Sequence, residues 1–440
     1  MITTTTADRR GDFGSARRNG KSAPRIAMLS VHTCPLAALG GKETGGMNVY
    51  VRELSRELGR RGYYVDAFTR SQNPEVPHIP DTDLGPTVRV IHVRSGPESP
   101  YPKEQVWDYL PEFVEGVRCH IASEGVGYDV YHSHYWLSGW VAHALEPMYP
   151  APTVQMFHTL GRMKDLVARR PEEREVGMRN YVEAQVMTWS DRVVAATPRD
   201  KEQMVKLYGA DADRIVVIPA GVDPALFHPI PKREARRLLG LPEDHKLILF
   251  VGRIEPLKGI DTLIEAVALA FKHRQDLRGE VELAIIGGDV TDDPARMSAE
   301  MNRLQALRNE LGVEDLVTFL GKQQQSSLPL YYSAAEAVVV PSHYESFGMV
   351  AVEALACGTP VIASDVGGLS YIVEDNVTGF LVPDQRPDIL ADRLEFLLET
   401  EPLRRAFGRR AAQAARRYSW SHIADEIIAL YSTLGVPALE

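Results

Sequence analysis

The sequence predicts an α/β protein built from two doubly wound, Rossmann-like domains that face each other across a cleft. The chain has 440 residues, which exceeds the size that one hydrophobic core usually serves. Short apolar runs alternate with amphipathic segments twice along the chain, a pattern typical of parallel sheets covered by helices. A stretch rich in proline and glycine, 219–231, separates the two series and predicts the linker.

The predicted boundaries follow from these patterns. They are a disordered tail at 1–23, an N-terminal domain at 24–219, a C-terminal domain at 220–420, and a last helix within 421–440 that packs back on the N-terminal domain.

The first half opens with an apolar strand at Arg25–Val31, and a loop that ends in Gly45 and Gly46 leads into a helix over about 48–61. This order is that of a dinucleotide fold. The G-x-G-x-x-G pattern is missing, however, so a nicotinamide cofactor has little support. The other elements expected here are strands at 64–69, 88–93, 129–132, 153–157, 192–196 and 215–218, and helices at 103–123, at 173–189 and up to 208.

The second half repeats the alternation. The expected elements are strands at 247–251, 281–286, 317–320, 338–340 and 360–363, and helices at 259–271, 295–311, from 348, and at 388–398, 403–418 and 421–434. Ligands of open parallel sheets lie beyond the carboxyl ends of the strands, so two such halves predict a cleft lined by the loops that follow the strands.

The segment 338–358 indicates a buried strand, a loop and then a helix, and it organises the second half. The β-branched run Val338–Val340 suits a buried parallel strand, and a helix begins near Gly348. The first amides of a helix have no partner inside it and carry partial positive charge. The amides of Phe347, Gly348 and Met349 are therefore candidates to bind a diphosphate.

Two acidic residues frame this predicted anion site. Glu345 precedes the helix and Glu353 lies inside it. Either one alone could be an ordinary surface acid. A carboxylate beside a phosphate repels it, so both are better suited to the hydroxyl groups of a ribose or a hexose.

A second cluster follows the strand at 247–251. Gly252, Arg253 and Lys258 lie where the diphosphate would be, and the two cations can neutralise it as a bond to it breaks. Gly45 and Gly46 in the first half would let backbone approach the same group, although a plain tight turn would also explain them.

Composition excludes several classes of partner. A net charge of −10 without a basic stripe argues against nucleic acid. The three cysteines, Cys34, Cys119 and Cys357, are far apart, which suits a reducing cytoplasm and excludes a close-spaced zinc motif. No apolar run approaches the ~20 residues of a membrane span. The basic segment 1–23 is interpreted as a disordered tail rather than a transit peptide.

Three motifs together carry a resemblance. E-S-F-G-M-V-A-V-E at Glu345–Glu353, G-R-I-E-P-L-K-G at Gly252–Gly259 and G-G-M-N-V-Y at Gly45–Tyr50 are similar to those of the retaining glycosyltransferases of family 4. The likeness extends over about 25–431. It implies a GT-B fold and transfer from a nucleoside diphosphate sugar without a catalytic metal or other cofactor.

The resemblance also implies roles for individual residues. Arg253 and Lys258 would hold the diphosphate, Glu353 the ribose and Glu345 the donor sugar. His158 follows another strand, and the family places a histidine there against the donor sugar. It need not be a general base, because the departing phosphate oxygen can take the acceptor's proton on the same face.

Within the family, two stretches resemble the branch that glycosylates small phosphorylated acceptors. His132–Gly139, together with the G-G-M-N-V-Y run, resembles D-inositol-3-phosphate glycosyltransferases, and Lys103–Leu110 resembles sucrose-phosphate synthases. The residues that would then hold the acceptor phosphate are Lys103, Tyr135, Thr159 and Arg179, with Asn48 and Arg162 as weaker additions. Inositol 3-phosphate and fructose 6-phosphate are level as acceptors, and UDP-glucose and UDP-N-acetylglucosamine are the leading donors by resemblance.

Three other functions stay open. A glycoside hydrolase could use Glu345 and Glu353 as paired carboxylates, but it leaves the two cations unexplained. A nucleotide-sugar epimerase would turn over donor without an acceptor. A binding module would show no turnover. The donor base is expected near Gly321 and Lys322, and the sequence leaves the oligomeric state open.

Overall fold

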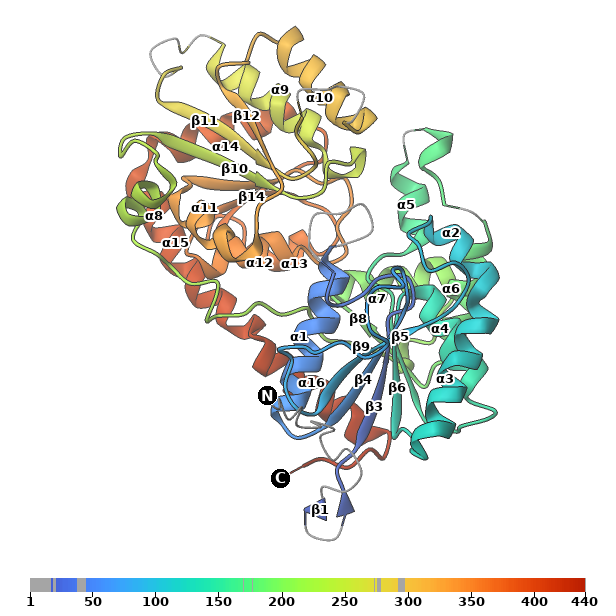
Figure 1. Ribbon diagram of the computed structural model, residues 1–440. Coiled ribbons are helices and arrows are strands. Elements are labelled where there is room, and N and C mark those ends of the chain that lie inside the picture. Colours follow the sequence, from blue (N-terminus) through green and yellow to red (C-terminus); the bar gives the residue numbers. More distant parts are fainter. Residues whose placement is uncertain are drawn as a thin grey trace, which may run out of the picture.

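The computed structural model describes residues 17–18, 21–37, 45–168, 170–175, 177–272, 274, 278–291 and 297–439, and these form two α/β domains (Figure 1). The N-terminal domain holds a seven-stranded sheet of order β5-β4-β3-β6-β7-β8-β9, and the C-terminal domain a six-stranded sheet of order β12-β11-β10-β13-β14-β15. All neighbouring strands in both sheets are parallel. The predicted fold class is therefore confirmed.

The elements of the N-terminal domain are as follows. Its strands are β3 (Arg25–Leu29), β4 (Tyr64–Arg70), β5 (Val88–Val93), β6 (Val130–His134), β7 (Thr153–Met156), β8 (Arg192–Ala195) and β9 (Ile215–Val217). Its helices are α1 (Gly46–Arg60), α2 (Lys103–Val106), α3 (Leu110–Glu124), α4 (Tyr135–Leu145), α5 (Gly161–Val167), α6 (Gly177–Trp189) and α7 (Pro198–Tyr208), with short 3-10 turns η1 (Trp107–Tyr109), η2 (Pro171–Glu173) and η3 (Ala212–Arg214).

The remaining elements follow the linker. The strands are β10 (Lys246–Val251), β11 (Val281–Ile286), β12 (Val317–Gly321), β13 (Ala337–Val340), β14 (Val361–Ser364) and β15 (Gly379–Val382). The helices are α8 (Lys232–Leu239), α9 (Ile260–Phe271), α10 (Ala299–Glu310), α11 (Leu328–Ala334), α12 (Met349–Ala356), α13 (Leu369–Ile372), α14 (Pro387–Glu399), α15 (Glu401–Ala415) and α16 (Trp420–Thr433), with 3-10 turns η4 (Pro256–Lys258), η6 (Gln325–Ser327) and η7 (Arg416–Tyr418).

The structure contains elements that the sequence analysis did not predict. Helix α4 is apolar over most of its surface, because it is buried against β6, β7 and α6, so it shows no helical period. Helix α8 has the opposite composition, with five charged residues among its eight. Strand β15 has four residues and lies at the sheet edge.

In two predicted regions a short 3-10 turn changes the bounds of the expected helix. The helix expected over 103–123 is divided by η1 into α2 and α3, and Pro111 lies in the first turn of α3, where a missing amide costs little. The helix expected from 173 begins at Gly177, after η2.

The predicted tail is described only in part. Residues 1–16 and 19–20 lie outside the described residues. Arg17–Arg18 and Lys21–Ser22 pair as two short antiparallel strands, β1 and β2, so this part of the tail has local backbone pairing that the sequence analysis did not predict.

Helix α16 crosses from the C-terminal domain to lie against α1 of the N-terminal domain (Figure 1). Tyr431 of α16 has its hydroxyl 2.7 Å from Nδ1 of His132, in the middle of β6. Arg61 donates to Asp425 at 2.9 Å. No helix among the described residues is long and apolar enough to cross a membrane.

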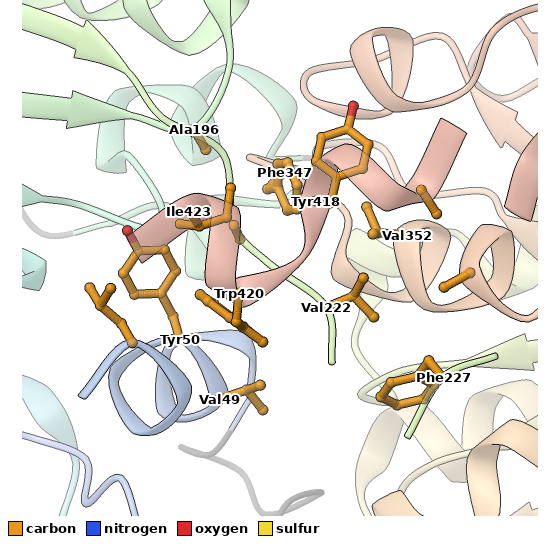
Figure 2. Close-up of a cluster of buried hydrophobic side chains, with 14 of the residues drawn as sticks. Val49, Tyr50, Ala196, Val222, Phe227, Phe347, Val352, Tyr418, Trp420 and Ile423 are labelled. Atoms are coloured by element: carbon orange, nitrogen blue, oxygen red, sulfur yellow. The ribbon is translucent and has the colours of Figure 1, made fainter. Parts of the chain in front are cut away.

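One apolar cluster takes side chains from both domains (Figure 2). The ring of Tyr50 in α1 lies 5.3 Å from that of Trp420 in α16. The ring of Phe347, next to α12, lies 5.8 Å from that of Tyr418. Since this cluster runs through the domain interface, burial of apolar surface fixes how the two sheets face each other.

Candidate active site

A cleft of about 520 Å³ lies between the two domains, beyond the carboxyl ends of their strands. Most of the residues predicted for the site line it. They are Gly45, Gly46, Asn48, Tyr135, His158, Thr159, Arg253, Lys258, Glu345, Phe347, Gly348, Met349 and Glu353. Residues of both domains therefore meet in one cavity.

The starts of two helices face each other in the cleft. A Cβ on Gly46, the first residue of α1, would lie 3.0 Å from Sδ of Met349, the first residue of α12. Gly348 caps α12 with a φ of +109°, a conformation that favours glycine. The first turns of both helices are fully described and carry no acidic side chain. Two positive helix ends thus converge on one space, which suits a diphosphate.

Hydrogen bonds of the Asn48 side chain connect the start of α1 to the residues that precede it. Its side-chain oxygen accepts from the amide of Gly45 at 3.0 Å, and its Nδ2 donates to Thr33 Oγ1 and to the carbonyl of Cys34, each at 2.6 Å. The side chain is buried. Asn48 lines the cleft, and its hydrogen bonds hold the loop at the start of α1.

The two predicted cations extend the same site. Nζ of Lys258, at the end of η4, lies 2.5 Å from Oε2 of Glu345. Arg253 follows β10, and its Nη1 lies 2.9 Å from Glu255. The backbone after Lys258 packs closely on the neighbouring strand, because a Cβ on Gly259, at φ +63°, would lie 2.1 Å from the carbonyl oxygen of Pro341. Lys258 is therefore held in place by a turn that favours glycine.

The loop that bears Glu345 is held by a second glycine pair. The amide of Gly368 donates to the carbonyl of Glu345 at 2.8 Å. A Cβ on Gly367, at φ +49°, would lie 2.0 Å from the same oxygen. The carboxylate of Glu345 thus projects from a fixed backbone and orients the ammonium of Lys258.

Glu353 lies one turn inside α12, and its side chain lines the cleft. The hydroxyl of Tyr332 donates to its Oε2 at 2.8 Å. Burial raises the pKa of Glu353 to about 7, although the hydrogen bond from Tyr332 lowers it. Because Glu353 lines the cavity, the second oxygen of its carboxyl group is suited to accept from sugar hydroxyls.

Replacing Glu353 by glutamine is expected to raise the KM for the nucleotide sugar about tenfold. An amide has one acceptor oxygen where a carboxylate has two, so the variant loses a hydrogen bond to the substrate of about 1.5 kcal/mol. The amide oxygen can still accept from Tyr332, so the fold is kept. Initial rates at varied donor concentration measure the effect. Glu310→Gln, on the exposed end of α10, is the matched control. An unchanged KM would place the ribose elsewhere.

His158 is an uncharged group in this site. It has a φ of +62°, and its Nε2 lies 3.0 Å from Nδ1 of His134. Burial lowers the pKa of His158 to about 3. The imidazole is therefore neutral near pH 7 and offers hydrogen bonding to a sugar rather than a charge to a phosphate.

The acceptor side of the cleft differs from the prediction at Arg179. Its side chain does not line the cavity and is only 1% exposed. The guanidinium donates to the carbonyl and Oγ1 of Thr159 at 2.9 and 3.0 Å, and pairs with Glu183 and Glu175, each at 2.7 Å. It also lies over the ring of Tyr135 at 4.8 Å. In this structure Arg179 supports Thr159 and Tyr135, which do line the cleft.

Lys164 is a cleft residue that the sequence analysis missed. It lies on α5, and its Nζ is 2.5 Å from Oε1 of Glu175, the oxygen that also faces Arg179. Its position shortly after the end of β7 at Met156 is the signal that could have found it. The side chain of Lys103 lies outside the described residues. Arg162 is turned away, stacked on Tyr208 and bonded to the carbonyl of Leu207.

The base region and metal ligands complete the survey. Lys322 lines the cleft and lies 2.7 Å from Asp289, while Gly321, at φ +68°, ends β12 beside it. The described residues hold no group of three or more His, Cys, Asp or Glu side chains placed to bind a metal ion.

Comparison with known proteins places the chain in a family. Residues 44–226 match the model described as Glycosyltransferase Family 4, and residues 231–414 the model described as Glycosyl transferases group 1. A D-inositol 3-phosphate glycosyltransferase of Actinosynnema mirum is 42% identical over 408 residues, which covers 92% of this chain and 96% of that protein. The same enzyme of Acidothermus cellulolyticus is 41% identical over 408 residues, covering 92% and 90%.

Solved structures agree with this assignment. Sucrose-phosphate synthase from Thermosynechococcus elongatus is 36% identical, with a TM-score of 0.85 and coverage of 94% of this chain and 99% of that one. HepE from Anabaena, in complex with UDP and glucose, has a TM-score of 0.70 at 21% identity, covers 93% and 100%, and supports the fold alone. The chain therefore belongs to the glycosyltransferases of the group 1 and family 4 type and has their GT-B fold.

Proposed function

We propose that this glycosyltransferase moves a hexosyl group from a nucleoside diphosphate sugar to a small phosphorylated acceptor, with retention of the anomeric configuration. UDP-glucose and UDP-N-acetylglucosamine are the expected donors. The observation that carries the proposal is the meeting of two helix starts with Arg253 and Lys258 in one cleft, beside Glu345 and Glu353. A site that combines diphosphate ligands with acceptors for hydroxyl groups fits a nucleotide sugar.

Each group has a role in the proposed reaction. The diphosphate lies at the starts of α1 and α12, with Arg253 and Lys258 neutralising the charge that develops as the bond from the anomeric carbon to the phosphate oxygen breaks. Glu353 accepts from the ribose. Glu345 accepts from the donor sugar and keeps Lys258 in place. No catalytic metal is expected, because the two cations and two helix ends supply the positive charge.

Retention follows if the new bond forms on the face that the leaving group departs from. The acceptor hydroxyl attacks the anomeric carbon, and its proton passes to the departing phosphate oxygen. A double displacement would need a nucleophile on the opposite face. The neutral His158 is suited to a hydrogen bond with the sugar rather than to that role.

The acceptor phosphate is expected in the corner formed by Tyr135, Thr159 and Lys164. Lys164 supplies a charge, and the two hydroxyls supply donors. Inositol 3-phosphate is the first acceptor to test, because relatives about 42% identical are named for it. Fructose 6-phosphate is the second, because the sucrose-phosphate synthase structure matches with a TM-score of 0.85.

The test is the release of free UDP from UDP-glucose or UDP-N-acetylglucosamine, with each acceptor present or absent. Acceptor-dependent release and an α-linked product, read from the anomeric proton by NMR, are expected. An inverted product contradicts the retaining mechanism. Conversion of the donor without acceptor would favour the epimerase, and binding of donor without turnover would favour the binding module.

Replacing Lys164 by alanine is expected to raise the KM for the phosphorylated acceptor roughly tenfold, because one charge-assisted hydrogen bond to phosphate is lost. Slow hydrolysis of the donor without acceptor is expected to stay unchanged, since the donor diphosphate is held by other groups, at the starts of α1 and α12. Lys206→Ala, exposed on α7, is the control. A parallel loss of donor hydrolysis would remove Lys164 from the acceptor site.

A further inference from the structure

Asp200 is a buried carboxylate at the domain interface that the proposed reaction leaves without a role. It lies in the first turn of α7, where Thr197 caps the helix and accepts from the amide of Asp200 at 3.1 Å. Its side chain, 3% exposed, reaches toward the other domain. The hydroxyl of Ser346 donates to its Oδ2 at 2.7 Å. This hydrogen bond joins α7 to the loop after β13.

Ser346 belongs to the loop that forms the wall of the cleft. It stands between Glu345, which orients Lys258, and Phe347, beside the start of α12. On its own side this loop is held through the backbone by Gly367 and Gly368. From the opposite domain, Asp200 contacts it through Ser346. A shift of this contact would therefore displace the carboxylate of Glu345 and the ammonium that it holds.

Apolar side chains lie beside the contact. Ala196, which follows β8, and Phe347 both belong to the apolar cluster that runs through the interface (Figure 2), and both line the cleft, as Ser346 does. The ionisable groups that face Asp200 are Glu345 and Tyr344, and both come from the same loop. Because Asp200 is buried, its hydrogen bond with Ser346 is stronger than the same bond would be in water.

The ionisation of Asp200 falls near neutral pH. Burial, with a smaller contribution from the charge of Glu345, raises its pKa to about 7 against the opposing effect of the hydrogen bonds from Ser346 and from the backbone at Ala196. An ionised carboxylate accepts a hydrogen bond more strongly than a protonated one. The strength of the contact to Ser346 is therefore expected to decrease as the pH falls through about 7.

We propose that Asp200 is a positioning residue for glycosyl transfer: through Ser346 it holds the loop of Glu345 against the N-terminal domain, and it holds this loop most firmly when it is ionised. The inference needs the transfer to occur in this cleft, but it does not depend on which acceptor is used. It predicts an effect on kcat rather than on donor binding, since Asp200 lies outside the cavity lining.

The experiment compares the wild type with Asp200→Asn, Asp200→Ala and Ser346→Ala between pH 6 and 8.5, in acceptor-dependent turnover and in donor hydrolysis without acceptor. The wild-type kcat is expected to fall about tenfold as the pH falls through about 7. Asp200→Asn keeps an acceptor oxygen but cannot ionise, so it should show the low rate at every pH. Asp200→Ala and Ser346→Ala should be at least as slow, and the double variant no slower than either.

Asp213→Asn, on the exposed turn before β9, should keep the wild-type profile. The proposal is overturned if Asp200→Ala retains the wild-type kcat and pH profile, or if Asp200→Asn still loses activity below pH 7, because the titrating group would then be another, such as Glu353. If Asp200→Ala does not fold, Asp200→Asn and Ser346→Ala decide. Absence of turnover in the wild type would instead contradict the proposed donors and acceptors, and donor hydrolysis would still test the role of Asp200.

Discussion

Replacing Lys258 by methionine is expected to lower kcat by roughly 10²–10³-fold, with a much smaller change in the KM for the donor. The ammonium stands at the end of η4, 2.5 Å from Glu345, on the wall that would face the diphosphate. Negative charge on the leaving phosphate grows as the glycosidic bond breaks, so a fixed cation there stabilises the transition state more than the bound donor. Steady-state kinetics with saturating acceptor measures the change.

Lys322→Met provides a matched comparison. Lys322 also lines the cleft and pairs with a carboxylate, Asp289 at 2.7 Å, but it lies where the base of the nucleotide is expected. Removing the charge of Lys322 should raise the KM for the donor and lower kcat by less than tenfold. Equal losses of kcat in both variants would mean that total positive charge, rather than the place of Lys258, is what matters. A wild-type kcat for Lys258→Met would exclude it from the reaction.

The fold could be predicted because its strands are buried on both faces. Val338–Val340 forms β13 and is almost fully buried, as a continuous β-branched run requires. Helix α4 could not be predicted in the same way, since a helix buried on most sides loses the alternation of polar and apolar residues. Pattern analysis therefore recovers short buried strands, which show as continuous apolar runs, and helices with one exposed face, which show a helical period. It misses a helix that is buried on most sides.

The cleft could be predicted on its C-terminal side for a different reason. There the candidate residues lie in loops directly after strands, and strand ends of a parallel sheet meet at one edge. On the acceptor side most of the candidates lie on helices, where the direction of a side chain decides its role. Lys164 faces the cleft and Arg179 faces inward, and each is simply a basic residue in the sequence.

One signal for Arg179 was nevertheless present. Glu175, Arg179 and Glu183 are spaced by four residues, the spacing at which ion pairs form along one helix face. The structure shows both pairs, at 2.7 Å each. A cation flanked by two acids at this spacing is already neutralised, which is a reason to doubt a direct role in phosphate binding.

Replacing Arg179 by alanine is accordingly expected to destabilise the N-terminal domain by about 3–5 kcal/mol, rather than to affect the acceptor alone. The carboxylate of Glu183 is fully buried, and its other partners among the described residues are the amide of Gly161 at 2.9 Å and the hydroxyl of Tyr208. Removing one partner of a buried ion pair leaves an uncompensated charge. Urea unfolding followed by circular dichroism measures the loss.

The exposed Arg94→Ala, directly after β5, should change stability by no more than about 0.5 kcal/mol. Arg179→Met combined with Glu183→Gln should recover part of the loss, because both charges are removed together. If Arg179→Ala instead unfolds at the wild-type urea concentration and raises only the KM for the acceptor, the guanidinium leaves its carboxylates to bind the phosphate, and the supporting role inferred from its burial is wrong.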